Sequence, residues 1–538
     1  MPQPVRRLVP LGVAALLLLS ACGGGGGGSS VAVPTGAGAG PDTREVKAGG
    51  SLVLALAEDP DALDPTLARS LVGREVFVNM CEKLYDIDAG LKIIPQLASA
   101  LPTTSADGKT VTIPVREGVR FNDGTPFDAA AVKTSLDRHL TLQASARKSE
   151  LSAVASVQVM DPKTVELTLK APFAPLTGVL ADRAGMVMSP AQLTKLGADF
   201  GSNPVCVGPF SFVSRQAGNE IALKKSTEYY DADKVKLDTV TYRVITDANV
   251  RLANVRSGDV QVSERIAPTD IAKVQGDSAL RLVTGDPLGY QGISINVGNT
   301  QGVGKPVGTV NTPLGTSKDL RKAFELSLDR DTINTVAFAG QYVPGCFPLP
   351  PGSPYLDASL TCPKRDVEQA KKLIAGSGAP TPVPVQLMIG TSPENLRIGQ
   401  VVQSLAKEAG FDVKVAPTEF ASSLDASDAG RFEAFAVGWS GRVDPDGNIT
   451  DFLLTGGARN ISGYSNPEVD AALGQARTSS DMAARKAAYT KALEIAADDN
   501  PIIYLYHQRN FLVSTPKVAG IAFYADGLPR LKAAGIAA

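Results

Sequence analysis

The 538-residue sequence has little histidine, a single tryptophan and no excess of basic charge. Its two histidines, His139 and His507, weaken any interpretation that needs a catalytic triad or a histidine-built metal centre. Lysine and arginine total 53 against 55 aspartates and glutamates, so the chain lacks the positive charge that a nucleic-acid backbone attracts. The motifs G-x-S-x-G, H-E-x-x-H and G-x-x-x-x-G-K-[ST] are missing, as is any C-x-x-C pair. These absences argue against a hydrolase, an ATPase and a zinc ribbon.

Long apolar runs are also missing, apart from one near the N-terminus. Residues 8–21 are uncharged and follow Arg6 and Arg7, but a bilayer-spanning helix needs about 20 residues. The run is typical of a secretory signal peptide. It ends in Leu19-Ser20-Ala21-Cys22, which resembles a bacterial lipobox. The resemblance implies a lipoprotein signal peptide over 1–21 and a diacylglyceryl group on Cys22; the alternative is an ordinary signal peptide with a chance cysteine.

Residues 22–48 are rich in small residues, and six consecutive glycines, 23–28, follow Cys22 directly. Such a segment buries too little apolar surface to offset the entropy of ordering it. We expect a flexible tether between the lipidated cysteine and a folded body. The protein is then exported and held at the outer face of the cell membrane, or on the periplasmic side in a Gram-negative cell.

Four cysteines remain in the exported body, and an even number outside the cytoplasm favours disulfides. Three pairings are possible. We favour Cys346–Cys362, which closes a loop rich in proline and glycine, and this choice leaves Cys81–Cys206 as the second pair. The alternative is two or more buried free thiols.

Segments with strand and helix patterns interleave along the whole body, which predicts an α/β fold. Glycines such as Gly258 and Gly410 mark expected helix ends, and Asp128 is an expected N-cap. The patterns predict strands at 51–57, 290–297, 435–439 and 502–506, and helices at 72–85, 129–140, 249–256, 320–338, 396–409 and 482–497.

Four segments resemble signatures of one family. Residues 115–126 (VREGVRFNDGTP) are the most specific, and 203–210, 320–330 and 438–446 follow in the same order. Together they resemble the extracellular solute-binding proteins of ABC importers, family 5. The resemblance runs from about Ser51 to Gly527. The segments themselves also fit plain turns and helices, so we interpret them as mainly structural.

The resemblance implies a bilobal, periplasmic-binding-protein-like fold of type II, in the large family-5 variant, with two lobes joined by a hinge. Lobe I is expected at 49–285 plus 505–538, with an inserted subdomain at about 71–206, and lobe II at 286–504. The implied function is capture of an oligopeptide or peptide-like solute between the lobes and its delivery to a membrane permease. The implied protein is a monomer without enzymatic activity, and separate subunits supply the ATPase.

Ligand contacts are expected at the single tryptophan. Trp439 ends a predicted strand, where it would form an apolar wall of the crevice between the lobes. The family has an acidic residue three positions later, but here that residue is Arg442. A guanidinium there favours a ligand carboxylate over an ammonium group. The alternative is that Arg442 pairs with Asp444 or Asp446 in its own loop.

Three further residues are candidate ligand contacts: Tyr290 by stacking from the hinge, Asn296 by its family position, and Arg397 as an anion contact before a helix. Each also has a structural interpretation, namely hinge packing, a strand end and a solvated helix start. Arg69, Ser70 and Arg74 are expected at the mouth of the crevice.

The sequence does not name the ligand. A non-peptide solute (an opine, a glycan or a metal chelate) fits the same fold, as does a role in presenting the ligand to a membrane sensor. A secreted hydrolase with a carboxylate pair is a more remote alternative. No cofactor and no metal site are expected.

Overall fold

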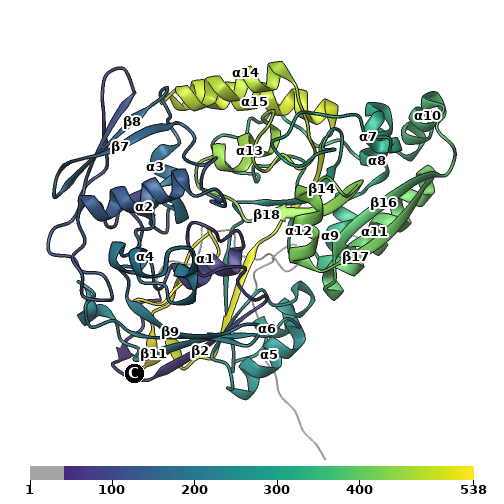
Figure 1. Cartoon of the computed structure of the whole chain (residues 1–538). Helices are drawn as coiled ribbons and strands as arrows, with labels where there is room; N and C mark the ends of the chain where they lie inside the picture. The colour runs from purple at the N-terminus through teal and green to yellow at the C-terminus, as the bar shows by residue number, and fades with distance from the viewer. Residues whose placement is uncertain (1–41) are drawn as a thin grey trace, which may run out of the picture. The chain divides into compact units, whose positions relative to one another are not determined.

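The computed structural model describes residues 42–538, which belong to one compact unit (Figure 1). Cys22, the signal peptide before it and most of the expected tether lie outside the described residues. Within residues 42–538, no helix is both long enough and apolar enough to cross a bilayer.

A large sheet joins strands from both ends of the described chain. Its central strand is β2, in which Leu52, Leu54 and Leu56 are fully buried. Strands β11 and β12 run parallel to β2, whereas β20 returns antiparallel from the C-terminal region. The strand order is β13 (Arg281–Gly285), β20 (Asn510–Ser514), β12 (Val262–Glu264), β2 (Ser51–Leu56), β11 (Thr239–Val244), β10 (Glu220–Lys225) and β9 (Phe210–Gln216). We call the part of the chain around this sheet the first lobe; it includes α1 (Leu71–Phe77), α5 (Ala248–Ser257) and α6 (Ile271–Gln275).

A smaller antiparallel sheet is inserted between β2 and β9 in the sequence. Its apolar residues belong to the same hydrophobic core as those of the larger sheet, so the insertion is part of the first lobe. Asp128 caps the neighbouring helix α2, as predicted, by accepting a 3.0 Å hydrogen bond from the Ala131 N–H. The inserted elements are β3 (Tyr85–Ile87), β4 (Ile93–Pro95), β5 (Thr103–Thr104), β6 (Thr110–Pro114), α2 (Ala129–Thr141), β7 (Val154–Asp161), β8 (Thr164–Leu169), α3 (Leu176–Val179), η1 (Arg183–Gly185) and α4 (Pro190–Leu196).

A second large sheet has its own hydrophobic core. Its strand order is β15 (Val343–Pro344), β19 (Ile502–His507), β14 (Tyr290–Ile295), β18 (Ala434–Trp439), β16 (Val383–Gly390) and β17 (Phe411–Thr418). We call the part around it the second lobe, whose longer helices pack against each other and on the sheet (Figure 1). They are α8 (Lys318–Ser327), α9 (Arg330–Phe338), α10 (Val367–Ser377), α11 (Pro393–Ala409), α12 (Phe420–Asp428), α13 (Asp446–Leu453), α14 (Pro467–Thr478) and α15 (Met482–Asp499). The predicted α/β class is confirmed.

Two short segments carry the chain from one sheet to the other. Residues 286–289 link β13 to β14, and residues 508–509 link β19 to β20. The His507 Nδ1–H donates a 2.7 Å hydrogen bond to the Gly289 carbonyl, so the two links lie side by side. They form the only covalent connections between the two large sheets in the described chain.

Two predicted helices were too long. The helix predicted over 72–85 ends at Phe77, because the chain there turns toward the short strand β3. The helix predicted over 320–338 is divided into α8 and α9, because Leu328 is extended and the Asp329 side chain caps a new helix at the Thr332 N–H. The glycine ends at Gly258 and Gly410 are confirmed, since both residues cap their helices in the left-handed conformation.

The four cysteines of the described chain form two disulfides. One joins Cys346 and Cys362 in the loop that follows β15, and the other joins Cys81 and Cys206 in the first lobe.

Candidate functional site

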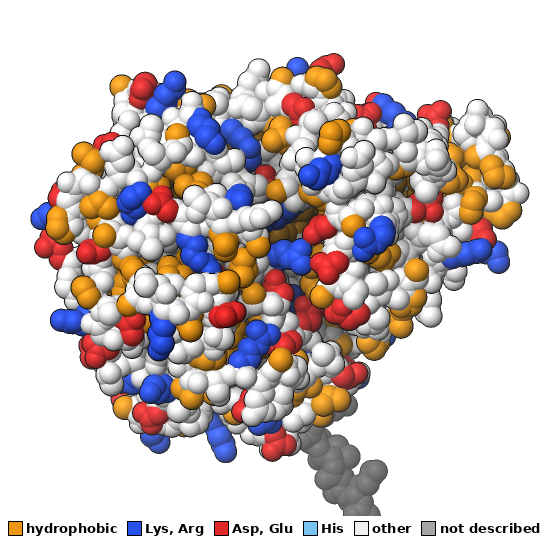
Figure 2. Space-filling view, viewed as in Figure 1, with side chains coloured by type: hydrophobic (Ala, Val, Ile, Leu, Met, Phe, Trp, Pro, Cys, Tyr) orange, Lys and Arg blue, Asp and Glu red, His pale blue; other side chains and the backbone are white. Residues whose placement is uncertain are grey.

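A cavity of about 40 Å³ lies between the two lobes. Figure 2 shows basic and acidic side chains next to each other around a recess on the face it displays. The first lobe contributes the loop residue Glu150, the region of α3 and Asp182. The second lobe contributes the end of β18 and the loop after it, α13, the loop that follows α13, and α14. The lining residues are Glu150, Pro175, Gly178, Val179, Asp182, Trp439, Arg442, Asp444, Asp446, Gly447, Asp451, Arg459 and Arg477.

Trp439 is in the cavity wall, at the end of β18 where the sequence predicted it. Its indole N–H donates a 3.1 Å hydrogen bond to Asn448 Oδ1, which also accepts from the Arg442 backbone N–H at 2.7 Å. The guanidiniums of Arg442 and Arg459 lie over the ring, 4.2 and 4.8 Å from its centroid. The ring is therefore fixed by one hydrogen bond and two cation–π contacts.

The turn after Trp439 depends on glycine. Gly441 has φ +87°, and a Cβ on it would come within 2.3 Å of the Leu288 backbone. A Cβ on Gly289 would meet the Trp439 carbonyl oxygen at 1.8 Å. This close approach of the hinge segment to the end of β18 directs the chain, and Arg442 with it, toward the first lobe.

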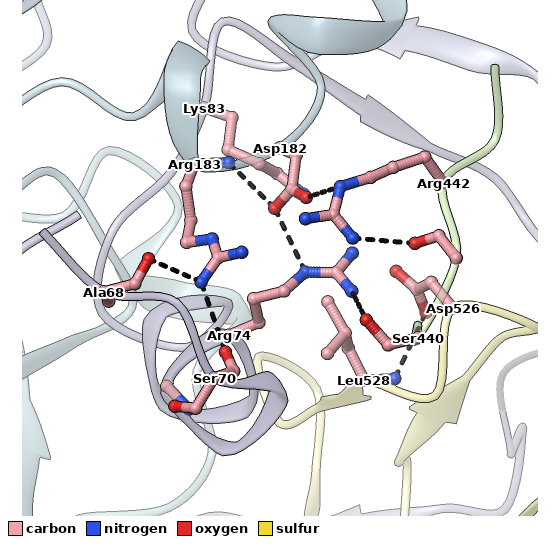
Figure 3. Close-up of polar contacts among 12 residues, drawn as sticks. Ala68, Ser70, Arg74, Lys83, Asp182, Arg183, Ser440, Arg442, Asp526 and Leu528 are labelled. Atoms are coloured by element: carbon pink, nitrogen blue, oxygen red, sulfur yellow. Dashed lines mark hydrogen bonds and ion pairs between the residues drawn. The ribbon is translucent and has the colours of Figure 1, made fainter. Parts of the chain in front are cut away.

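Arg442 reaches across to the first lobe. Its Nε lies 2.6 Å from Asp182 Oδ2, and its Nη1 donates to the Gly441 carbonyl at 2.8 Å (Figure 3). Its Nη2 is buried and has no hydrogen-bond partner within residues 42–538. Burial lowers the pKa of Arg442 to about 9, against the opposite effect of Asp182.

The predicted alternative, pairing of Arg442 within its own loop, is wrong. Asp444 binds both terminal nitrogens of Arg485, at 2.9 and 2.7 Å, and Asp446 binds Arg477 at 2.8 and 3.0 Å. Both acids are thus held by arginines of α14 and α15 within the second lobe, which leaves Arg442 for Asp182.

Two buried arginines of the first lobe, Arg74 and Arg183, also contact Asp182. Arg74 Nε donates to Asp182 Oδ1 at 3.1 Å, and its Nη1 lies 3.4 Å from the Ser440 hydroxyl of the second lobe. Arg183 donates from Nη1 to the carbonyls of Ala68 and Ser70, at 2.8 and 3.2 Å, and Figure 3 shows its guanidinium facing that of Arg74. Burial alone would raise the pKa of Asp182, yet Arg442 and Arg74 hold it well below its ordinary value.

A second chain of ion pairs crosses between the lobes next to this one. Glu150 accepts from Arg147 at 2.7 Å and from Arg459 of the second lobe at 2.9 Å. Arg459 also pairs with Asp451 at 2.9 Å. Burial would raise the pKa of Glu150, but Arg147 and Arg459 lower it to about 2, so the carboxylate stays charged.

The rim carries a further contact between the lobes. Arg69 of the first lobe lies 3.0 Å from Asp428 and 3.5 Å from Asp425, both on α12. These side chains are largely exposed, so the pairs contribute little. Of the residues expected at the mouth, Arg69 and Arg74 thus contact the opposite lobe, whereas Ser70 caps α1.

The other three predicted contacts are away from the cavity. Tyr290 packs edge-on against Tyr504 and Phe452, with ring centroids 4.7 and 5.7 Å apart. The Asn296 side chain holds a loop by bonding the backbone of residues 298–299, 430 and 432. Arg397 donates to the Ala337 carbonyl at 3.2 Å. None of the three lines the cavity in the part of the chain that the structure describes.

Sequence reasoning missed most charged residues of the site. Arg147, Glu150, Asp182 and Arg183 lie in segments without a motif, and Arg459 follows α13 in a glycine-rich loop. The one local signal was the acid–base dipeptide Asp182-Arg183, which is common on ordinary surfaces.

Comparison with known proteins agrees with this architecture. The chain is 29% identical over 490 residues to the glutathione-binding protein GsiB of Pectobacterium atrosepticum, covering 88% of this chain and 92% of that one. The structure of AgaA of A. tumefaciens in complex with agropinic acid superposes with a TM-score of 0.80 at 25% identity, over 90% of this chain and 99% of that one. DppA of Helicobacter pylori, in complex with the peptide STSA, gives 0.83 at 22% identity, over 91% and 99%.

These relatives confirm the predicted bilobal, periplasmic-binding-protein-like fold. The model of the family described as bacterial extracellular solute-binding proteins, family 5, matches residues 92–460. That match covers more than half of the sequence and includes most of the cavity lining. The chain therefore belongs to the bacterial extracellular solute-binding proteins of family 5.

Proposed function

We propose that this protein is the substrate-binding subunit of an ABC importer that captures a peptide-like solute through a carboxylate bound to Arg442. The observation that carries the proposal is the free Nη2 of Arg442, which is buried in the cavity wall without a partner in the described chain. A guanidinium binds a carboxylate best through two parallel N–H groups, here those of Nε and Nη2. Asp182 pairs with the Nε of Arg442 alone. A ligand oxygen at Nη2 would occupy the second N–H group.

The rest of the cavity suits the same kind of solute. Trp439 offers an apolar surface for a side chain or a peptide plane. Asp446 and Asp451 also line the cavity, where a ligand amine would share their carboxylates with Arg477 and Arg459. At about 40 Å³ the cavity is smaller than a peptide, so entry requires the lobes to separate around the links at 286–289 and 508–509.

Two relatives support a carboxylate-bearing ligand. The GsiB protein is described as binding glutathione, a γ-linked tripeptide with two carboxylates and one ammonium group. The AgaA structure holds agropinic acid, which is an acid by name. A glycan without an acidic group fits Arg442 less well.

The test is calorimetric titration of the folded body against glutathione and short α-linked peptides, each with free and with blocked termini. We expect binding that survives N-acetylation and is lost when the carboxylate is amidated. Arg442→Glu should abolish binding, because it places a negative charge beside Asp182. Binding that ignores C-terminal amidation, or unchanged affinity in Arg442→Glu, would contradict the proposal. Arg397→Glu is the matched control and should bind normally, since Arg397 is away from the cavity.

The proposal includes the cellular setting. Export and a diacylglyceryl anchor on Cys22 would keep the protein beside permease subunits, whose separate ATPase subunits drive uptake. Two acyl chains suffice for stable anchoring. Replacing Cys22 by Ser should release the protein from membranes in cell fractionation, and a protein that stays in the membrane fraction would refute the anchor.

A further inference from the structure

The charged side chains around the cavity do not balance. They form two neighbouring sets of ion pairs that meet at Trp439, where Arg442 of one set and Arg459 of the other lie over the ring. We call the two sets together the buried network, and Arg183 joins it through its backbone N–H to Asp182 and its position beside Arg74 (Figure 3). The network has six guanidiniums and four carboxylates, an excess of two positive charges: Arg74, Arg147, Arg183, Arg442, Arg459 and Arg477 against Glu150, Asp182, Asp446 and Asp451.

Water does little to screen this excess. Arg147 and Arg183 are 0% and 1% exposed, and no side chain of the network exceeds 20%. The remaining acid of the cavity wall, Asp444, is balanced by Arg485. The next charged groups outward are Asp61, Arg69, Asp425 and Asp428. Asp61 is exposed, and the side chains of the other three are 43%, 71% and 46% exposed, which weakens their effect on the interior.

Several network donors lack an acidic partner. Within the described chain, the Nε atoms of Arg147 and Arg183 and the Nη2 of Arg442 make no hydrogen bond. Arg147 and Arg183 both use the neutral Ala68 carbonyl as an acceptor, at 3.1 and 2.8 Å. Burial and the neighbouring Arg147 lower the pKa of Arg183 well below its ordinary value, as expected where positive charges outnumber negative ones.

We propose that the buried network selects peptide-like solutes of net negative charge, with two acidic groups against at most one amine. This inference rests on the proposed function and specifies its substrate class. One acidic group binds the Nη2 of Arg442. Arg183, which does not line the cavity, acts as a specificity-determining residue through its charge rather than by contact. Coulomb's law, at an effective dielectric constant of about 20 and a separation of about 10 Å, gives roughly a tenfold change in affinity per unit of charge.

The experiment compares ligands of one shape that differ by one charge. The two pairs are S-carboxymethylglutathione with S-carbamoylmethylglutathione, and Ala-Glu-Ala with Ala-Gln-Ala, each titrated by calorimetry into the wild-type body. In the pair that binds, the member with the additional carboxylate should bind about tenfold to a hundredfold tighter. Equal or tighter binding of its less negative partner overturns the inference and leaves the proposed function intact. If no member of either pair binds, the proposed function fails, and the inference fails with it.

A variant then assigns the preference to the network. Arg183→Gln should reduce the ratio of the two affinities by about tenfold. Arg330→Gln is the matched control, because Arg330 is also buried and ion-paired, with Glu325 at 2.8 Å, but lies outside the cavity lining. The ratio should not change in this control, and an unchanged ratio in Arg183→Gln overturns the role of Arg183. If Arg183→Gln does not fold, the wild-type ratio alone still decides the charge preference.

Discussion

Replacement of Asp182 by Asn should open the lobes. Asp182 is 6% exposed and is the shared counter-ion of Arg442, at 2.6 Å, and Arg74, at 3.1 Å. Removing one partner of a buried ion pair costs about 3–5 kcal/mol, because the other charge is left without compensation. Asn keeps the volume and can still accept from the Arg183 N–H, so the change is mainly one of charge.

Most of this cost should appear in lobe closure rather than in unfolding. Arg442 belongs to the second lobe and Asp182 to the first, so separation of the lobes lets water reach the unpaired guanidinium. A loss of about 3 kcal/mol shifts the closed-to-open ratio by more than a hundredfold. Small-angle X-ray scattering without ligand should therefore give a larger radius of gyration for Asp182→Asn than for the wild type.

The rim pair provides the control for this experiment. Arg69→Ala also removes a contact between the lobes, but Arg69 is 43% exposed at its side chain, and such pairs contribute at most about 1 kcal/mol. Its scattering should resemble that of the wild type. If Asp182→Asn scatters like Arg69→Ala, the ion pair between Arg442 and Asp182 does not hold the lobes together.

Three further predictions concern the disulfide, a histidine and the tryptophan. Replacing Cys346 and Cys362 by Ser frees a loop with a sequence separation of 16 and should lower the unfolding free energy by about 3 kcal/mol, measured by urea titration; a loss below 1 kcal/mol would refute it. Burial lowers the pKa of His139 to about 3, so the unfolded chain binds more protons below its own pKa of about 6.5. Stability should therefore fall by up to about 1.4 kcal/mol per pH unit from pH 6.5 toward 3 through this group, and His139→Gln should remove that contribution. Trp439→Ala should weaken ligand binding about tenfold and Trp439→Phe less, because the ring supports two guanidiniums; equal affinities by calorimetry would contradict this.

Local chemistry made much of the fold predictable. Asp128, Gly258 and Gly410 act within one helical turn, so their capping roles could be read directly from the sequence. The division at Asp329 was missed because the apolar spacing continues across it, and only the extended Leu328 and the new cap interrupt the helix. The same limit applies at Phe77, where tertiary packing ends the helix before the apolar pattern does.

The site was predictable only where a motif identified it. Trp439 and Arg442 were found because they stand in a recognisable segment at a strand end. Asp182 lies 260 positions from Arg442 in the sequence and Glu150 lies 309 from Arg459, so no local pattern relates them. Tyr290 shows a different limit: its position next to the hinge could be predicted, but the packing of its ring against an aromatic cluster, outside the cavity lining, could not.

The hydrogen bond between His507 and the Gly289 carbonyl gives the two links a common axis. Two connections held side by side permit rotation of one lobe about that line and oppose sliding of one sheet past the other. Displacement in such a rotation grows with distance from the axis, so the contacts between the lobes that lie farthest from 286–289 and 508–509 separate the most.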